Sequence, residues 1–158
     1  MLLTACEPGT LSNGTTFQRQ YIAARKALEA GSYDSALRGY AALIPHAGPL
    51  EPRVRLEYAH ALLRASRYDE AAQVAGALAT GTEGSNRAAA LAVLGTAQHE
   101  SALADIAAGR RGPGTVAKLR SADAALKEMQ SLDQDMDPLG AMADRRTDIA
   151  RELKQLGA

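Results

Sequence analysis

The chain has 158 residues, about the length of one domain, and at 46% hydrophobic and 23% charged it can bury a core and is not a disordered chain. Its 18 Lys and Arg balance its 18 Asp and Glu, which excludes the broad basic surface of a typical nucleic-acid-binding protein. Its 34 Ala and 20 Leu are strong helix formers and Trp is absent, so the composition favours closely packed helices over a sheet.

The first segment, residues 1–16, contains the only cysteine, so no internal disulfide is expected. Leu3-Thr4-Ala5-Cys6 resembles a bacterial lipobox, whose cysteine becomes the lipidated first residue of the mature protein. Residues 7–16 are polar and rich in turn formers, which predicts a flexible tether. Too few residues precede Cys6 for the charged and apolar parts of a signal peptide, so this interpretation requires a start upstream of Met1. The alternative is a free thiol on a cytoplasmic tail.

From Phe17 onward the apolar residues follow a helical period, and no stretch alternates with period two for long enough to predict a strand. Segments rich in Gly and Pro separate the helical stripes. We predict seven helices, at about residues 17–30, 33–45, 50–65, 68–79, 86–108, 115–134 and 138–156. For the last of these, Asp137 is the expected N-cap and Pro138 the expected first residue.

An internal repeat is visible in the pairs Tyr33-Asp34 and Tyr68-Asp69, which lie 35 residues apart in similar surroundings. Together with Leu91-x-x-Leu94-Gly95 and Ala36-x-x-x-Tyr40, the pattern resembles the tetratricopeptide repeat (TPR), a pair of antiparallel helices. The resemblance covers about residues 17–137 and implies an all-α, right-handed superhelical stack of about three helix-turn-helix repeats. We expect small residues where one helix backbone lies against the next, at the following positions: Ala24, Ala36, Ala59, Ala71 and Gly95.

The third repeat is too long, because 54 residues separate Ala71 from Ala125, about 20 more than one repeat. The helical stripe continues past Gly95 and resumes after the turn at 109–114, so we predict a third hairpin with two elongated arms. The alternative is a loop inserted between helices of ordinary length, although long structureless loops are uncommon in compact domains. The final helix is expected to cap the open end of the stack. Residues 17–158 would then form one repeat domain.

Candidate chemistry is sparse, because the sequence contains no recognisable catalytic motif, and we expect neither enzymatic activity nor a cofactor. The best metal candidate combines His60 and His99 with Glu57 and Glu100, since two histidines and a carboxylate can bind zinc. No two histidines have the i, i+4 spacing that places two ligands on one helix face, and a polar groove wall explains them more simply. We therefore predict no metal site.

By the TPR resemblance, the first helices of successive repeats line a concave groove that holds a peptide or partner segment. The groove residues that it implies are Tyr21, Arg25, Leu28, Arg53, Leu56, His60, Arg64, Thr96 and His99. The family's two-carboxylate clamp is not implied, because Tyr21, Arg25 and Glu57 occupy the positions where it needs Lys and Asn. At the tip of the third hairpin, Arg110 and Arg111 are a second candidate contact, for anionic lipid or an acidic partner.

These features indicate a non-enzymatic protein-interaction scaffold, lipid-anchored on the periplasmic side of a bacterial envelope. Similar lipoproteins assist the assembly of pilus, secretion or outer-membrane complexes, which is the partner class that the resemblance suggests. The alternative is a soluble cytoplasmic TPR adaptor or regulatory protein without an anchor. Nucleic acid is not an expected partner, and the only membrane contact expected of the first hypothesis is the N-terminal lipid.

Overall fold

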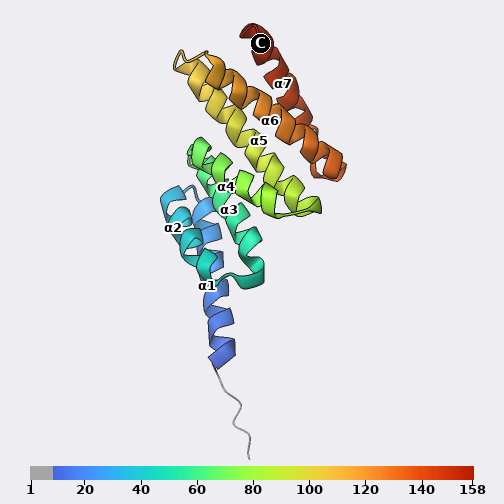
Figure 1. The fold of residues 1–158 in the computed structure, drawn as a ribbon. Helices are drawn as coiled ribbons and strands as arrows, with labels where there is room; N and C mark the ends of the chain where they lie inside the picture. The colour runs from blue at the N-terminus through green and yellow to red at the C-terminus, as the bar shows by residue number, and fades with distance from the viewer. Residues whose placement is uncertain (1–8) are drawn as a thin grey trace, which may run out of the picture.

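The computed structural model describes residues 9–158, and this part of the chain is built from helices and turns without a strand (Figure 1). Its helices are α1 (Gly9–Glu29), α2 (Tyr33–Leu43), α3 (Glu51–Arg64), α4 (Tyr68–Gly81), α5 (Gly84–Ala107), α6 (Pro113–Leu132) and α7 (Ala141–Gln155). Short 3-10 turns η1 (Ile44–His46) and η2 (Gly48–Leu50) join α2 to α3, and η3 (Gln134–Met136) precedes α7. The all-α prediction is confirmed.

The helices form a stack of hairpins, α1/α2, α3/α4 and α5/α6, in which each helix packs on the next one along the chain. The same turn closes all three hairpins, because one residue with positive φ follows each first helix: Gly31 (φ 75°), Ser66 (φ 59°) and Gly109 (φ 77°). After each of them the backbone N–H of the next residue returns to a carbonyl five residues earlier, as Arg67 does to Leu62 at 2.9 Å. The repetition seen in the sequence is therefore a repetition of structure.

Small residues allow the helices to pack closely, as the sequence predicts. Ala36, Ala59 and Ala71 are fully buried, and Ala24 and Gly95 are buried as well. A Cβ at Gly95 would lie 2.6 Å from Cγ of Leu126, and one at Gly39 would lie 2.8 Å from Cβ of Ala24. These contacts leave no room for a methyl group between the helices.

The third hairpin has long arms. Its helices α5 and α6 have 24 and 20 residues, whereas α3 and α4 have 14 each. The predicted elongation is confirmed, and the alternative of a loop inserted between ordinary helices is wrong. α7 packs on this hairpin through Ile149, which is fully buried against Leu119 and Leu126, so the last helix caps the stack.

Two predicted boundaries are wrong. α1 begins at Gly9 rather than at 17, so the described part of the expected tether, 9–16, is helical. Extending an existing helix costs much less free energy than nucleating one, which lets a polar stretch continue α1 backwards. Residues 1–8, and with them Cys6, lie outside the described part of the chain. Among the helices from residue 9 onward, none is both long and apolar enough to cross a membrane.

The other difference concerns α7, which begins at Ala141 rather than at Pro138. Gly140, with φ 72°, turns the chain immediately before the helix. Asp137 still caps it from three residues further back, because its carboxylate accepts the backbone N–H groups of Met142 and Ala143, each at 3.0 Å. These N–H groups hold the pKa of Asp137 below its usual value. The N-cap position of α7 is thus Gly140 and not Asp137 as predicted, although the Asp137 side chain still accepts the first N–H groups of the helix across the turn.

Candidate protein-interaction surface

Two hollows lie on either side of α3. The first, of ≈ 270 Å³, lies between α3, the end of α4 and the start of α5, and it is lined by Pro52, Arg53, Leu56, Glu57, Leu78, Thr82, Asn86 and Ala90. The second, of ≈ 430 Å³, lies between α1 and the start of α3, and it is lined by Gly14, Phe17, Gln18, Tyr21, Leu50, Arg53 and Val54. Residues of α1, α3 and α5 therefore line two hollows that share Arg53.

Arg53 lines both hollows. Its side chain is exposed and makes no hydrogen bond or ion pair with any residue that the structure describes. Leu56 borders it on one side and Val54 and Leu50 on the other. Arg53 is thus an unpaired charge between one hollow of mixed lining and one that is largely apolar.

Tyr21 of α1 is held in place by contacts with α3 and α2. The hydroxyl of Tyr21 donates a hydrogen bond to Oε1 of Glu57 at 3.3 Å, and the Tyr21 ring meets Tyr40 edge-on, with ring centres 6.1 Å apart. Tyr40 is fully buried, and its hydroxyl has no hydrogen-bond partner among residues of the described structure. Burial raises the pKa of Tyr40 to about 12. This packing keeps Tyr21 in one place at the edge of the second hollow.

The other predicted groove residues interact with side chains of the protein itself. Nε of Arg25 donates to Oε1 of Glu29 at 3.0 Å, and this bond raises the pKa of Arg25. The guanidinium of Arg64 lies 5.9 Å from the ring centre of Tyr33, within cation–π range. Partial burial lowers the pKa of His60, an effect that the charge of Glu57 opposes. Leu28 packs against the core of the first hairpins.

Thr96 and His99 do not line an open groove, because α7 covers them. His99 is 2% exposed, with Nε2 2.8 Å from Oε2 of Glu152 and Nδ1 2.9 Å from Nη1 of Arg145. Oγ1 of Thr96 lies 3.9 Å from Sδ of Met142. Their assignment to the partner groove is wrong for this fold, because the C-terminal helix supplies both the apolar cover and the counter-charges.

The same contacts bear on the metal candidate. A guanidinium only donates hydrogen bonds, so Nδ1 of His99 accepts from Arg145, and Nε2 carries the hydrogen that faces Glu152. Arg145 also donates to Oε1 of Glu100 at 2.9 Å. Both nitrogens of His99 are therefore occupied by protein groups. Within residues 14–158, no three His, Cys, Asp or Glu side chains gather in a way that would hold a metal ion.

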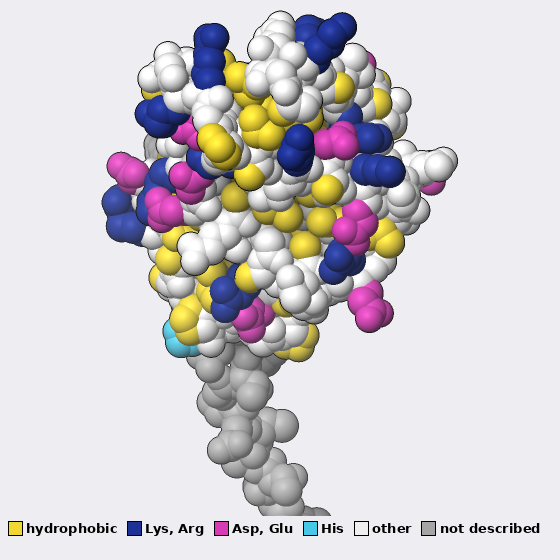
Figure 2. All heavy atoms as spheres, turned by 45° about the horizontal axis from the view of Figure 1, so that its top comes forward, with side chains coloured by type: hydrophobic (Ala, Val, Ile, Leu, Met, Phe, Trp, Pro, Cys, Tyr) yellow, Lys and Arg dark blue, Asp and Glu magenta, His cyan; other side chains and the backbone are white. Residues whose placement is uncertain are grey.

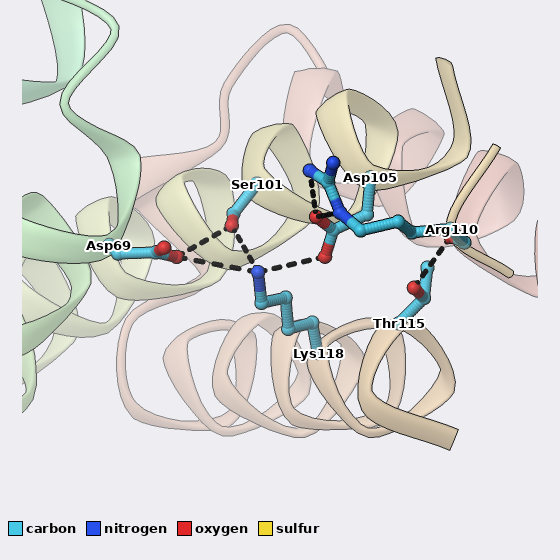
Figure 3. A network of polar contacts seen from close by, with 6 residues as sticks. All are labelled: Asp69, Ser101, Asp105, Arg110, Thr115 and Lys118. Carbon is cyan, nitrogen blue, oxygen red and sulfur yellow. Dashed lines mark hydrogen bonds and ion pairs between the residues drawn. The ribbon is translucent and has the colours of Figure 1, made fainter. Parts of the chain in front are cut away.

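At the tip of the third hairpin the two candidate arginines differ in their contacts, of which Figure 3 shows those of Arg110. Arg110 is paired with Asp105, whose Oδ1 accepts from Nε at 2.9 Å and from Nη2 at 2.6 Å. Lys118 donates to the other oxygen of Asp105 at 2.8 Å, and the two cations together hold the pKa of Asp105 below its usual value. Arg111 is exposed and makes no ion pair with the part of the chain described here.

Lys118 also donates to Oγ of Ser101 at 2.7 Å, a pairing that in some enzymes serves as base and nucleophile. Here Asp105 raises the pKa of Lys118, which keeps the ammonium charged. Ser101 is 5% exposed, and its hydroxyl donates to Asp69 at 2.6 Å. The arrangement therefore links α4, α5 and α6 and does not provide an activated nucleophile (Figure 3).

Several residues of the surface were absent from the prediction. Phe17 could have been found, since it is the only phenylalanine and lies one helical turn before Tyr21 on the same face. Leu50 and Leu78 come from a 3-10 turn and from a second helix, and no first-helix pattern points to them. Asn86 and Ala90 replace Thr96 and His99 as the residues that α5 contributes.

Comparison with known proteins adds no relative, since no protein-family model, curated protein or solved structure matches this chain.

Proposed function

We propose that this protein is a non-enzymatic scaffold that binds an acidic, partly apolar segment of a partner protein along α1, α3 and α5. The observation that carries the proposal is the position of Arg53, exposed and unpaired where both hollows meet. A carboxylate between two apolar side chains would pair with this guanidinium and fill the hollow on each side. Arginine is among the residues enriched at the energetic centres of protein interfaces.

The surrounding charges are mixed. Arg25 is paired with Glu29, and Arg64 lies over the ring of Tyr33. Glu57, whose carboxylate accepts the Tyr21 hydroxyl, lines the first hollow but not the second, where Arg53 is the only charged residue of the described lining. Apolar lining from Phe17, Leu50 and Leu56 supplies area that a partner can cover.

The test begins with a photo-crosslinking residue at Gln18 or Asn86, one in each hollow, with Lys127 on the outer side of α6 as the control position. Crosslinking in the cells of origin identifies the partner, which is then purified for binding measurements. We expect Arg53→Ala to weaken binding by about 1–2 kcal/mol. Arg55→Ala is the matched control, since Arg55 lies on the same helix but is paired with Glu51. Equal losses for both variants, or crosslinks from Lys127 alone, would contradict the groove.

We further propose that the protein is lipid-anchored through Cys6 on the periplasmic side of a bacterial envelope, where it assists assembly of a pilus, secretion or outer-membrane complex. The support is the lipobox-like Leu3-Thr4-Ala5-Cys6. Expressed behind a complete signal peptide in bacteria, the protein should incorporate a labelled fatty acid, and Cys6→Ser should abolish the label. Labelling that survives the substitution would remove the anchor proposal. If the native protein, isolated from its cells of origin, carries no lipid, the cytoplasmic adaptor is favoured instead.

A further inference from the structure

Apolar side chains are exposed at the end of α6 and in the turn that leads to α7. Leu132 and Met136 are 42% and 38% exposed, and Leu139 is 92% exposed. Asp135 and Asp144 are exposed nearby in the chain and make no ion pair or side-chain hydrogen bond with any described residue. We call these five residues the acidic knob. Apolar side chains that gather within a polar rim mark interaction sites.

A hollow of complementary character lies at the other end of α6. It has a volume of ≈ 670 Å³ and is lined by Arg111, Gly112, Pro113, Val116, Ala117, Arg120, Leu156, Gly157 and Ala158. Arg111 and Arg120 are exposed and unpaired within the described structure, unlike Arg110, which Asp105 neutralises. We call this the tip hollow. It combines an apolar floor with two free guanidinium groups.

The knob and the hollow cannot meet within one molecule. They lie at opposite ends of α6, whose 20 residues span about 30 Å. Figure 2 brings the α5–α7 end of the molecule forward and shows hydrophobic surface between Lys and Arg side chains there. The elongation of the third hairpin is what separates the two surfaces.

We propose that the acidic knob of one copy binds in the tip hollow of the next, so that copies of this chain associate head to tail. Leu139 enters the hollow, and Asp135 and Asp144 face Arg111 and Arg120. Each molecule carries both halves of the contact, and this favours a second copy over a membrane, which would engage the arginines and leave Leu139 exposed. Because knob and hollow are different surfaces, the contact is heterologous and propagates along a chain of molecules.

The association uses residues outside the groove and does not depend on the proposed function. The full chain is examined by sedimentation velocity over a range of concentrations and ionic strengths. Its mean mass should rise with concentration and fall with added salt, because the facing charges are exposed. Leu139→Asp, and the double variant Arg111→Glu/Arg120→Glu, should each weaken association by about tenfold or more, the change expected on removing a central anchor. Ile22→Asp, at a 43% exposed residue of α1, is the control and should associate normally.

A mixing experiment separates this geometry from a symmetric dimer. Leu139→Asp retains an intact hollow, and Arg111→Glu/Arg120→Glu retains an intact knob, so an equimolar mixture should form dimers and stop there. Circular dichroism confirms that each variant is as helical as the parent. A mixture that stays monomeric, or a parent that is monomeric at every concentration, overturns the proposal. A monomeric parent that sediments with anionic phospholipid vesicles through Arg111 and Arg120 overturns it in favour of a lipid site.

Discussion

The two halves of the molecule use charge differently. In α1–α4 most ion pairs are local, as in Arg25–Glu29, Arg55–Glu51 and Arg67–Glu70, and of the described residues only Asp69 pairs with a residue of another helix, Lys118 of α6. In α5–α7 most of them join different helices, as in Lys118–Asp105 and Arg146–Asp123. An ion pair within one helix does not position that helix against another, whereas an ion pair between two helices does.

Apolar packing is close in both halves. The short hairpins are held by close apolar contacts such as Gly39 on Ala24 and the buried ring of Tyr40. The long arms of α5 and α6 also pack closely, since Leu126 lies directly against Gly95. Partly exposed ion pairs such as Lys118–Asp105 add further contacts between these two arms. The first half keeps Arg53 free for a partner, and the second uses its charges for its own architecture.

The largest effect is expected from apolar packing in the first half. Leu62 is 1% exposed, and Leu62→Ala should lower the free energy of unfolding by about 2–5 kcal/mol, measured by denaturant titration. Arg55→Ala, which removes an exposed ion pair on the same helix, should lower it by no more than about 0.5 kcal/mol. Comparable losses of stability for Leu62→Ala and Arg55→Ala would contradict the conclusion that apolar packing, rather than ion pairs, stabilises this half of the molecule.

Close approach is tested by adding one methyl group. Gly39→Ala should destabilise the protein by about 1–3 kcal/mol, because the new Cβ would meet Cβ of Ala24, which cannot rotate away. Gly95→Ala should destabilise the protein as well, since its Cβ would meet the fully buried Leu126 and the backbone oxygen of Ala122. The measurement is again equilibrium unfolding, and unchanged stability of either variant would show that the two helices can move apart at that contact.

The charge network of the second half should be sensitive to acid. Asp105→Asn should lower the free energy of unfolding by about 1–2 kcal/mol at neutral pH, because it leaves Lys118 and Arg110 without their carboxylate. The folded pKa of Asp105 is depressed, so its contribution is complete above the unfolded pKa, about 3.9, and is lost as pH falls through the folded value. Melting curves of parent and variant should therefore converge once the pH has fallen below the depressed folded pKa of Asp105. A difference that is constant with pH would contradict the ionic role.

The smallest effect has the opposite sign. Tyr40→Phe should raise the free energy of unfolding by about 1 kcal/mol, because it removes a buried hydroxyl without a partner and keeps the ring contact with Tyr21. A loss of stability would show that this hydroxyl is hydrogen-bonded in solution. Leu28→Met, which nearly conserves the volume of a half-buried side chain in the same region, serves as the control.

Much of the fold was predictable because its signals are local. Turns at Gly31, Ser66 and Gly109 repeat with the helices that they end, and Ala36 and Ala71 mark the close contacts. The candidate surface was predictable only in part. Tyr21, Arg53 and Leu56 line the hollows as expected, whereas Leu50 and Leu78 reach them from elements that the first-helix pattern does not include.

The sequence by itself determined the helical class, the order of the hairpins and the length of the third one, because periodicity and turn residues act over a few positions along the chain. Only the tertiary structure decided which charges stay free. His99 became part of the interior because Glu152, 53 residues away, and Arg145 reach it from α7. Arg110 is paired with Asp105, whereas Arg111 and Arg53 make no ion pair within the described structure. Whether a charge finds a distant partner depends on side chains that the folded backbone brings together, and spacing along the chain indicates only the local pairs, such as Arg25–Glu29.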